Sequence, residues 1–344
     1  MKERPYLSIV AASRNDDHAG NILKRMRLFV AGLIAQTNRH RLPAELIMVE
    51  WNPPEDQPLL QHILPKPQNG DFLTVRYLIV PKEIHQHYRL SSEISLFQMI
   101  AKNVGIRRAK GQFVLCTNID ILFSDELFRT LAAKNLRDNT FYRANRCDVP
   151  DLIDAAWDLS QQLAWCDQNI IRRLGRNMRF KNINLEMVGF RNATYLTKWI
   201  LNKSAWMLNF FLPEERRTYY QADCLACGDF TLMAKEAWLD IQGYPELDLH
   251  ALHVDTLAIL AALALGYRQH VFPLRACIYH IDHPQGWESM TPLEKVRFLE
   301  KKPGIDYGLV YDLGQHVLKN RRAYDLNCDD WGYANLILAE HSFP

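Results

Sequence analysis

The 344-residue sequence lacks the long apolar run that a membrane-spanning helix requires. Its first residues, MKERPYLSIV, contain too short an apolar run for a secretory signal. An excess of one charge is also missing, because 41 Lys and Arg residues nearly balance 39 Asp and Glu residues. A net charge of +2 gives no strong basic field, so nucleic acid is not expected as a partner. We therefore expect a cytoplasmic protein, and contact with a membrane surface stays open.

Signals for cysteine pairing are scarce as well. The seven cysteines are odd in number and scattered along the chain, which favours reduced thiols. Cys224 and Cys227 form a C-x-x-C, but no second pair or histidine partner stands at zinc-finger spacing. Redox or zinc chemistry at this pair is therefore a minor alternative.

The composition is that of a globular enzyme with a sizeable core, since 48% of the residues are hydrophobic and 23% are charged. Apolar runs and amphipathic segments alternate along the first third of the chain. We expect strands at 7–12, 46–49, 72–80 and 113–117, and helices at 21–36 and 94–108. This alternation predicts an α/β protein whose mostly parallel sheet is flanked by helices on both faces.

Polar segments that contain acids follow three of these strands, at Ser13–Asp17, Glu50–Asn52 and Asn118–Asp120. Because the carboxyl ends of parallel strands lie along one edge of a sheet, these segments should lie where ligands bind. Asn118 and Asp120 point the same way if the backbone is extended. One carboxylate and one amide oxygen would suit a Mg²⁺ or Mn²⁺ ion that holds a diphosphate. The alternative is a turn in which both side chains bond their own backbone.

The stretch from Gln98 to Asp120, QMIAKNVGIRRAKGQFVLCTNID, resembles the nucleotide-diphospho-sugar transferases of the A-type fold, especially the inverting group called family 2. In that family a helix reading A-R-N-x-G-I precedes a buried strand that ends in D-x-D. The counterparts here are Ala101–Ile106 and Asn118–Asp120, and Asn118 stands in place of the first Asp. The resemblance implies a GT-A-type, Rossmann-like α/β fold and a nucleotide-sugar donor, UDP-sugar first, held through Mn²⁺ or Mg²⁺.

The same resemblance implies a set of donor-binding residues. In the family, the loop after the first strand and an acid after the second hold the nucleoside. Ala12 and Arg14 are therefore expected beside the base and Glu50 beside the ribose or uracil, with Asn103 in the same set. Alternatively, Arg14 pairs with the acids that follow it, and Glu50 is an exposed acid at a strand end.

A second group of residues lies in the stretch GDFTLMAKEAWLDIQGYPE, which begins at Gly228, and in the helix beyond it. The family carries there an E-D pair at a helix start, whose second acid is the usual general base. This chain has Val254 in place of the Glu, so only Asp255 is carried over. A carboxylate beside an apolar helix can have a raised pKa and accept the proton of an acceptor hydroxyl. The alternative is an acid that only favours the helix dipole. Asp229 is the second catalytic candidate.

Two histidines are candidate ligands for the cation. Residues 276–281 read as a strand, and metal-dependent members of the family place a histidine after the last core strand. His280 matches that placement best, and His283 is the second candidate. The alternative is a hydrogen-bonded structural histidine.

The rest of the chain is read as additions to this core. Ser124 looks like a helix start, 139–146 like a strand and 151–174 like one long helical segment. The basic run RRLGRNMRFK favours a solvated face, with contact to an anion as the alternative. Thr291-Pro292-Leu293-Glu294 is a capping-box signature for a further helix. We expect a transferase domain at 1–285 and a packed helical extension at 286–344. The domain is expected to consist of a nucleotide-binding half at 1–122 and an acceptor half at 123–285, and the acceptor half includes an insertion at 151–222.

The sequence thus predicts a glycosyltransferase that moves a sugar, with inversion, from a nucleotide-diphosphate sugar to a saccharide or glycolipid acceptor, in polysaccharide or glycoconjugate synthesis. Retention is a variant. A non-catalytic sugar- or partner-binding module is the first rival, since Asn118 and Val254 stand where the family has acids. A sugar-phosphate nucleotidyltransferase is the second, but its glycine-rich loop should follow the first strand, where ASRNDDHAGN holds one glycine.

Overall fold

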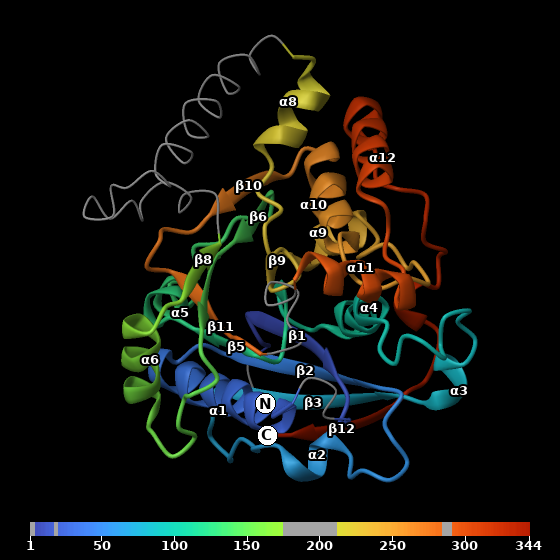
Figure 1. Cartoon of the computed structure of the whole chain (residues 1–344). Coiled ribbons are helices and arrows are strands. Elements are labelled where there is room, and N and C mark those ends of the chain that lie inside the picture. Colours follow the sequence, from blue (N-terminus) through green and yellow to red (C-terminus); the bar gives the residue numbers. More distant parts are fainter. Residues whose placement is uncertain (1–3, 17–19, 175–211, 284–290) are drawn as a thin grey trace.

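Figure 1 shows the computed structural model of the chain, which describes residues 4–16, 20–174, 212–283 and 291–344. The strands are β1 (Leu7–Ser13), β2 (Ala44–Trp51), β3 (Leu73–Val80), β4 (Phe113–Thr117), β5 (Ile121–Phe123), β6 (Thr140–Arg143), β7 (Asn145–Val149), β8 (Arg172–Leu174), β9 (Phe230–Ala234), β10 (Arg268–Val271), β11 (Cys277–Ile281) and β12 (Ala339–Phe343).

The helices of the described residues connect and flank these strands. They are α1 (Ile22–His40), α2 (Leu60–Ile63), α3 (Lys82–His85), α4 (Gln98–Arg108), α5 (Asp125–Ala132), α6 (Leu159–Gln168), α8 (Glu214–Gln221), α9 (Lys235–Asp240), α10 (Val254–Ala264), α11 (Pro292–Lys301), α12 (Tyr307–Asn320) and the 3₁₀ helix η3 (Trp331–Tyr333). Within the described residues, no helix combines the length and the apolar character needed to cross a bilayer.

A large, mostly parallel sheet forms the centre of the protein, which confirms the predicted α/β class. Its strand order is β10-β6-β9-β4-β1-β2-β3-β12. The neighbours β4, β1, β2 and β3 are parallel, as are β6 and β10, whereas β9 and β12 pair antiparallel with their neighbours. This layout is the one that the family resemblance implied. The carboxyl ends of β1, β2 and β4 consequently lie along one edge of the sheet.

Local signals in the sequence agree with several element boundaries. The strand at 113–117 has the predicted bounds, and α5 begins after Ser124, whose side chain accepts the Leu127 N–H. Thr291 and Glu294 form the expected capping box at α11. Helix caps are set by a few neighbouring residues, so they can be read without knowledge of the tertiary structure.

A second, smaller sheet with the order β5-β11-β7-β8 continues beyond the central sheet, and here two predictions are wrong. The strand expected at 139–146 is interrupted at Ala144, so that β6 belongs to the central sheet and β7 to the second. The long helical segment expected at 151–174 contains only α6, and its end is strand β8. Strand β8 pairs antiparallel with β7, and this pairing with a distant segment overrides the local apolar spacing.

The C-terminal segment contains the helix expected at Thr291, α11, and a further helix, α12, but it ends in a strand. Strand β12 pairs antiparallel with β3, and Glu340 forms an ion pair with Arg76. Arg107 and Arg108 of α4 donate hydrogen bonds to backbone carbonyls of this segment, at Asp329, Trp331, Gly332, Tyr333 and Leu336. The segment is therefore tied to the nucleotide-binding half that was predicted from the first third of the sequence.

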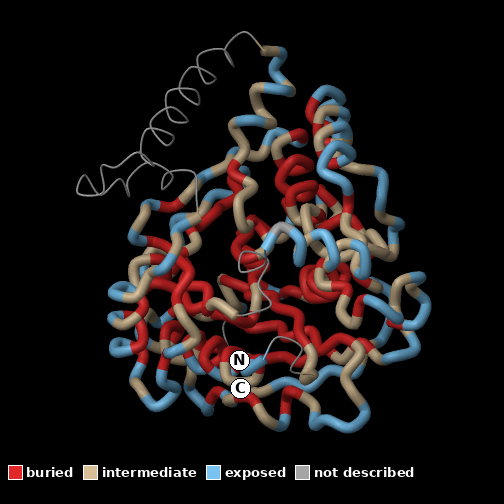
Figure 2. Tube along the Cα trace, viewed as in Figure 1, coloured by how far each residue is buried: buried red, intermediate tan, exposed pale blue. Residues whose placement is uncertain are grey.

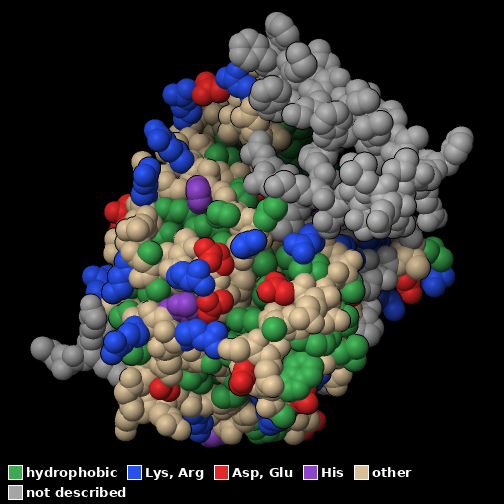
Figure 3. All heavy atoms as spheres, turned by 90° about the vertical axis from the view of Figure 1, so that its left-hand side faces the viewer, with side chains coloured by type: hydrophobic (Ala, Val, Ile, Leu, Met, Phe, Trp, Pro, Cys, Tyr) green, Lys and Arg blue, Asp and Glu red, His purple; other side chains and the backbone are tan. Residues whose placement is uncertain are grey.

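Burial and surface charge follow the composition. Figure 2 shows buried residues along the central strands and in α4 and α10, whereas α8 and α12 carry many exposed residues. On the face seen in Figure 3, Lys and Arg side chains are interspersed with Asp and Glu, as the small net charge predicts. Among the residues that the structure describes, that face offers no extended basic surface for a polyanion.

Helix α4 approaches β1 closely at Gly105, and this contact gives a testable prediction. A Cβ atom at residue 105 would lie 2.4 Å from Val10 Cγ1. We expect Gly105→Ala to lower the free energy of unfolding by about 1–2 kcal/mol, because overpacking outweighs the helical preference of alanine. Urea denaturation measures the loss. Val10→Ala in the same chain should reverse part of it, and a Gly105→Ala protein as stable as the parent would contradict this packing.

Candidate functional site

Three side chains that can bind a metal meet beside the end of β4. Asp120 lies between β4 and β5, His280 is in β11, and His283 follows β11. The Asp120 Oδ2 atom is 3.5 Å from His280 Nε2 and 3.6 Å from His283 Nε2. One ligand atom of each residue lies within 4.8 Å of the others. The antiparallel pairing of His280 with Ile121 places them together, because Ile121 directly follows Asp120.

The composition of this cluster suits a divalent cation. Asp120 Oδ1 and His283 Nδ1 are buried and have no hydrogen-bond partner among the described residues. A buried polar atom without a partner is costly unless another group binds it. Carboxylate oxygens suit Mn²⁺ and Mg²⁺, whereas imidazole suits transition metals. The residues present therefore fit Mn²⁺ better than Mg²⁺.

Charged groups surround His280, which is 5% exposed. Its Nδ1 atom is 3.1 Å from Asp148 Oδ1 and 3.0 Å from Arg146 Nη2. Burial alone lowers the pKa of His280, but the carboxylates of Asp120 and Asp148 outweigh burial and raise this pKa to about 9. Burial raises the pKa of Asp120, yet the two histidines hold it well below its usual value. The carboxylate of Asp120 and the ring of His280 thus each stabilise the charged form of the other.

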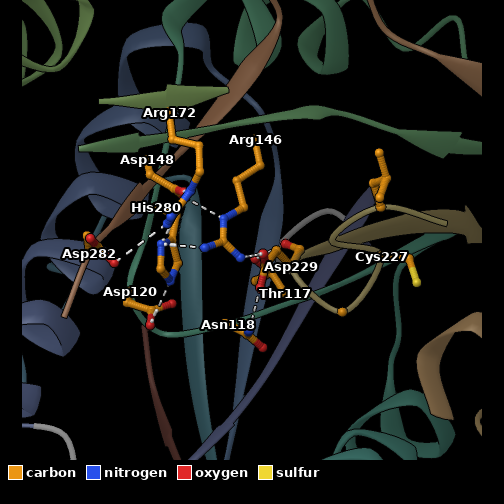
Figure 4. A network of polar contacts seen from close by, with 12 residues as sticks. Thr117, Asn118, Asp120, Arg146, Asp148, Arg172, Cys227, Asp229, His280 and Asp282 are labelled. Carbon is orange, nitrogen blue, oxygen red and sulfur yellow. Dashed lines mark hydrogen bonds and ion pairs between the residues drawn. The ribbon is translucent and has the colours of Figure 1, made fainter. Parts of the chain in front are cut away.

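Arg146 connects the histidine with Asp229, as Figure 4 shows. Its Nη1 atom is 2.7 Å from Asp229 Oδ2. Asn118 Nδ2 donates to the other oxygen, Asp229 Oδ1, over 2.6 Å. Asp229 precedes β9, and β9 pairs antiparallel with β4, so the residue lies beside Asn118. Both carboxylate oxygens of Asp229 therefore have partners within the protein.

The amide oxygen of Asn118 is also engaged. It accepts hydrogen bonds from Gln98 Nε2 and from Lys102 Nζ, each over 2.8 Å. Lys102 is fully buried and also donates to the Gly228 carbonyl oxygen over 2.8 Å. Burial lowers the pKa of Lys102, and the nearby carboxylates, those of the site acids among them, oppose this. Asn118 thus holds two neighbouring elements together, and its oxygen is directed at donors rather than at the histidines.

Asp255 lies in the first turn of α10, close to the segment that carries Asp229. Its Oδ1 atom accepts the Thr256 N–H over 2.9 Å. A Cβ atom on Gly228 would lie 2.9 Å from Asp255 Oδ2, so the absence of a side chain at residue 228 permits this close approach. The half-buried carboxylate of Asp255 and the carboxylate of Asp229 are thereby brought to the same region.

The residues expected beside the nucleoside base lie at the carboxyl end of β1. Ala12 is buried within the strand and pairs with β2. Arg14 Nη1 donates to the Ser95 carbonyl over 3.2 Å, and Arg14 Nε is 3.0 Å from Asp16, which is the alternative pairing that the sequence left open. Asn52 Nδ2 reaches the same Ser95 carbonyl over 3.5 Å. The ends of β1 and β2 therefore meet as predicted.

Glu50 and Asn103 are fully buried and have partners inside the protein. The two carboxylate oxygens of Glu50 lie 3.1 and 3.0 Å from the Leu60 N–H, so Glu50 is not the exposed acid of the alternative interpretation. Asn103 Nδ2 donates to the Tyr244 carbonyl and its Oδ1 accepts the Tyr244 N–H, each over 2.8 Å. The structure brings neither residue to the cluster of Asp120, and a role for them in donor binding stays a prediction.

Burial raises the pKa of Glu50 to about 7 from an ordinary value of 4.5, although the Leu60 N–H opposes the shift. The pKa of this carboxyl group is higher in the folded chain than in the unfolded chain, so its protonated form stabilises the folded chain. This stabilisation is complete below pH 4.5 and is lost as the pH rises through about 7. We expect Glu50→Gln to raise the free energy of unfolding by up to about 3 kcal/mol near pH 8 and to change it little near pH 4. Chemical denaturation at both pH values measures this.

The control for Glu50→Gln is Glu83→Gln, which removes the same charge from an exposed position on α3. It should show no comparable dependence on pH. Equal effects of Glu50→Gln at both pH values would contradict the raised pKa of the buried carboxyl group.

Sequence reasoning missed four charged residues of the site, namely Lys102, Arg146, Asp148 and Arg172. Arg146 and Asp148 alternate along β7 in FYRANRCDV, and charged residues spaced by two in an otherwise apolar strand were an available signal. Arg172 belongs to the basic run that was interpreted as solvated, yet its Nε atom forms an ion pair with the fully buried Asp148. Arg173 of that run also lies in β8, whereas Arg176, Arg179 and Lys181 lie outside the described residues.

No protein-family model and no curated protein matches this chain. Solved structures similar to it include residues 1–349 of TarS from S. aureus, with 14% identity and a TM-score of 0.40 over 92% of this chain and 71% of that chain. The structure of the same protein in complex with UDP-GlcNAc gives 13% identity and a TM-score of 0.45 over 92% and 72%. Similarity at this level does not establish a family, so the function must be inferred from the site.

Proposed function

We propose that this protein is a glycosyltransferase that moves a sugar from a nucleoside diphosphate sugar to a hydroxyl group of a saccharide or glycolipid. The observation that carries the proposal is the meeting of Asp120, His280 and His283 at the carboxyl edge of a mostly parallel sheet. Ligands of such sheets bind at that edge. Two further carboxylates lie close by and could activate an acceptor: Asp229, which contacts Asn118 and Arg146, and Asp255, which approaches Gly228.

Asp120, His280 and His283 would hold the cation, with Mn²⁺ as the first choice. The cation would supply Lewis-acid stabilisation of the departing diphosphate. Arg146 is a fixed cation that pairs with Asp229, and the carboxylates of Asp229, Asp255 and Asp120 interact electrostatically with the buried Lys102. Preorganised charge of this kind is usually the largest contribution to catalysis.

Asp255 is the residue that we propose takes the proton of the acceptor hydroxyl. Asp229 is less available, because both of its oxygens already accept hydrogen bonds from Arg146 and Asn118. Asp255 has one oxygen bound to a backbone N–H and the other beside Gly228. Direct attack by the hydroxyl oxygen on the anomeric carbon forms one bond as the bond to the diphosphate breaks, and it inverts the configuration there. A UDP-sugar is the first donor to test, and polysaccharide or glycoconjugate synthesis is the expected setting.

The deciding experiment incubates the full chain with a panel of UDP-sugars, with Mn²⁺ or with a chelator, and measures release of UDP. We expect release with Mn²⁺ and strong loss with the chelator. A nucleoside diphosphate present at 100 times its dissociation constant should raise stability by about 2.7 kcal/mol in a thermal-shift assay. Stabilisation by donors without turnover in the presence of acceptors would support a sugar-binding module instead. The anomeric configuration of a product distinguishes inversion from retention.

A further inference from the structure

We infer that Asp148 is a positioning residue that fixes the orientation of His280 for cation binding, an inference that rests on the proposed function. The two residues are direct neighbours across parallel strands, because the register of β7 and β11 pairs Asp148 with His280. Asp148 Oδ1 is 3.1 Å from His280 Nδ1. The opposite ring atom, Nε2, faces Asp120. The imidazole ring therefore stands between the carboxylate of Asp148 on one side and that of Asp120 on the other, as Figure 4 shows.

Asp148 cannot reach solvent, since its exposed fraction is 0%. Its two oxygens contact Arg146 Nε over 2.6 Å, Arg172 Nε and the His280 ring. A carboxylate so deeply buried needs partners of this kind. It is not one of the three residues whose ligand atoms converge on the cation cluster. Its contact with His280 is thus the route by which it can act on that cluster.

A cation bound at Nε2 of His280 takes the place of the proton on that nitrogen, so the ring then keeps a single proton, on Nδ1. A carboxylate can only accept, so the Asp148 contact requires the proton on Nδ1 and leaves the Nε2 lone pair for a cation. Arg146 Nη2, which is 3.0 Å from the same Nδ1 atom, can only donate. Donation from Arg146 would place the proton on Nε2, where it blocks cation binding. Asp148 therefore selects the form of His280 that can bind a cation.

The test compares Mn²⁺ binding by the unaltered chain and by Asp148→Asn, using calorimetry on the full chain. The amide keeps the shape of the carboxylate but removes its charge and can present an N–H to Nδ1. We expect the dissociation constant for Mn²⁺ to rise about 10–100-fold, the range typical for partners behind a metal ligand. The control is Asp223→Asn. Asp223 is also a buried acid, but its side chain accepts the Leu225 N–H, and it is not a member of the cation cluster.

Two results would overturn the inference. Either Asp148→Asn, folded by circular dichroism, binds Mn²⁺ within about twofold of the unaltered chain, or Asp223→Asn weakens binding just as much. In both cases the unaltered chain still binds Mn²⁺, so the proposed function survives. Absence of Mn²⁺ binding by the unaltered chain removes the proposed cation site and this inference together.

A second measurement needs no variant at Asp148 and covers the case in which Asp148→Asn does not fold. The chain is labelled with ¹⁵N-histidine and loaded with Zn²⁺ as a diamagnetic probe, and His280→Gln identifies the signal of residue 280. We expect the proton on Nδ1 of His280 in the loaded protein. A proton on Nε2 contradicts the inference, because that nitrogen could not then bind the cation.

Discussion

Asp120→Asn should lower the affinity for Mn²⁺ at least about 100-fold, or about 2.7 kcal/mol, and turnover about 10³-fold at a fixed Mn²⁺ concentration. Asp120 is the only carboxylate of the three residues whose ligand atoms converge in the described chain. Its Oδ1 atom is buried without a partner among those residues, so a cation is the group that would complete its coordination. Titration calorimetry with Mn²⁺ and an assay of UDP release measure the two quantities.

Asp125→Asn is the matched control for Asp120→Asn. Asp125 also pairs with a histidine, since its Oδ1 atom is 2.9 Å from His40 Nε2, but it lies at the start of α5. We expect Mn²⁺ affinity and turnover to be unchanged in this variant. If Asp120→Asn, folded to the same melting temperature as the parent, kept its Mn²⁺ affinity within a few fold, the assignment of the cation cluster would be wrong.

The second large effect is expected from Asp255→Asn. We expect kcat to fall about 10²–10⁴-fold, which is the usual contribution of a general base, with the dissociation constants for Mn²⁺ and UDP unchanged. The reason is that Asp255 is near the site but is not one of the cluster residues that would hold the cation and the diphosphate. Steady-state kinetics and calorimetry with UDP separate the loss of turnover from a loss of binding.

Asp229→Asn is the comparison variant, because it tests whether Asp229 rather than Asp255 is the general base. Asp229 is bound by Arg146 and Asn118, so its replacement should disturb the local network and change donor binding together with turnover. If Asp229→Asn lost turnover with binding intact while Asp255→Asn stayed active, the two acids would exchange roles. If both variants kept the activity of the unaltered chain, a carboxylate base at either position would be excluded.

Much of the central sheet could be predicted because its signals are local. The strand at 113–117 is a short apolar run, and Ser124 and Thr291 start helices through bonds to residues three positions away. The edge where Arg14 and Asn52 meet follows from the rule that parallel strands end on the same side. Strand β12 was missed, since its pairing with β3 joins residues far apart in the chain.

In the candidate site, too, the sequence predicted some features and not others. Asp120 and His280 were predicted from their places after or within expected strands, and the structure brings them together with His283. The sequence did not show that Asn118 would be occupied by Gln98 and Lys102. Such hydrogen bonds depend on how α4 lies against β4, which no local pattern encodes.

The sequence by itself determined the α/β class, the edge of the sheet that carries the polar residues, and the residue types available for a cation. Only the tertiary structure decided that β7 and β11 lie in a second sheet, and hence that Asp148 stands behind His280. The physical reason is that strand register is set by contacts between distant segments, and a shift of one residue would turn these side chains to the other face.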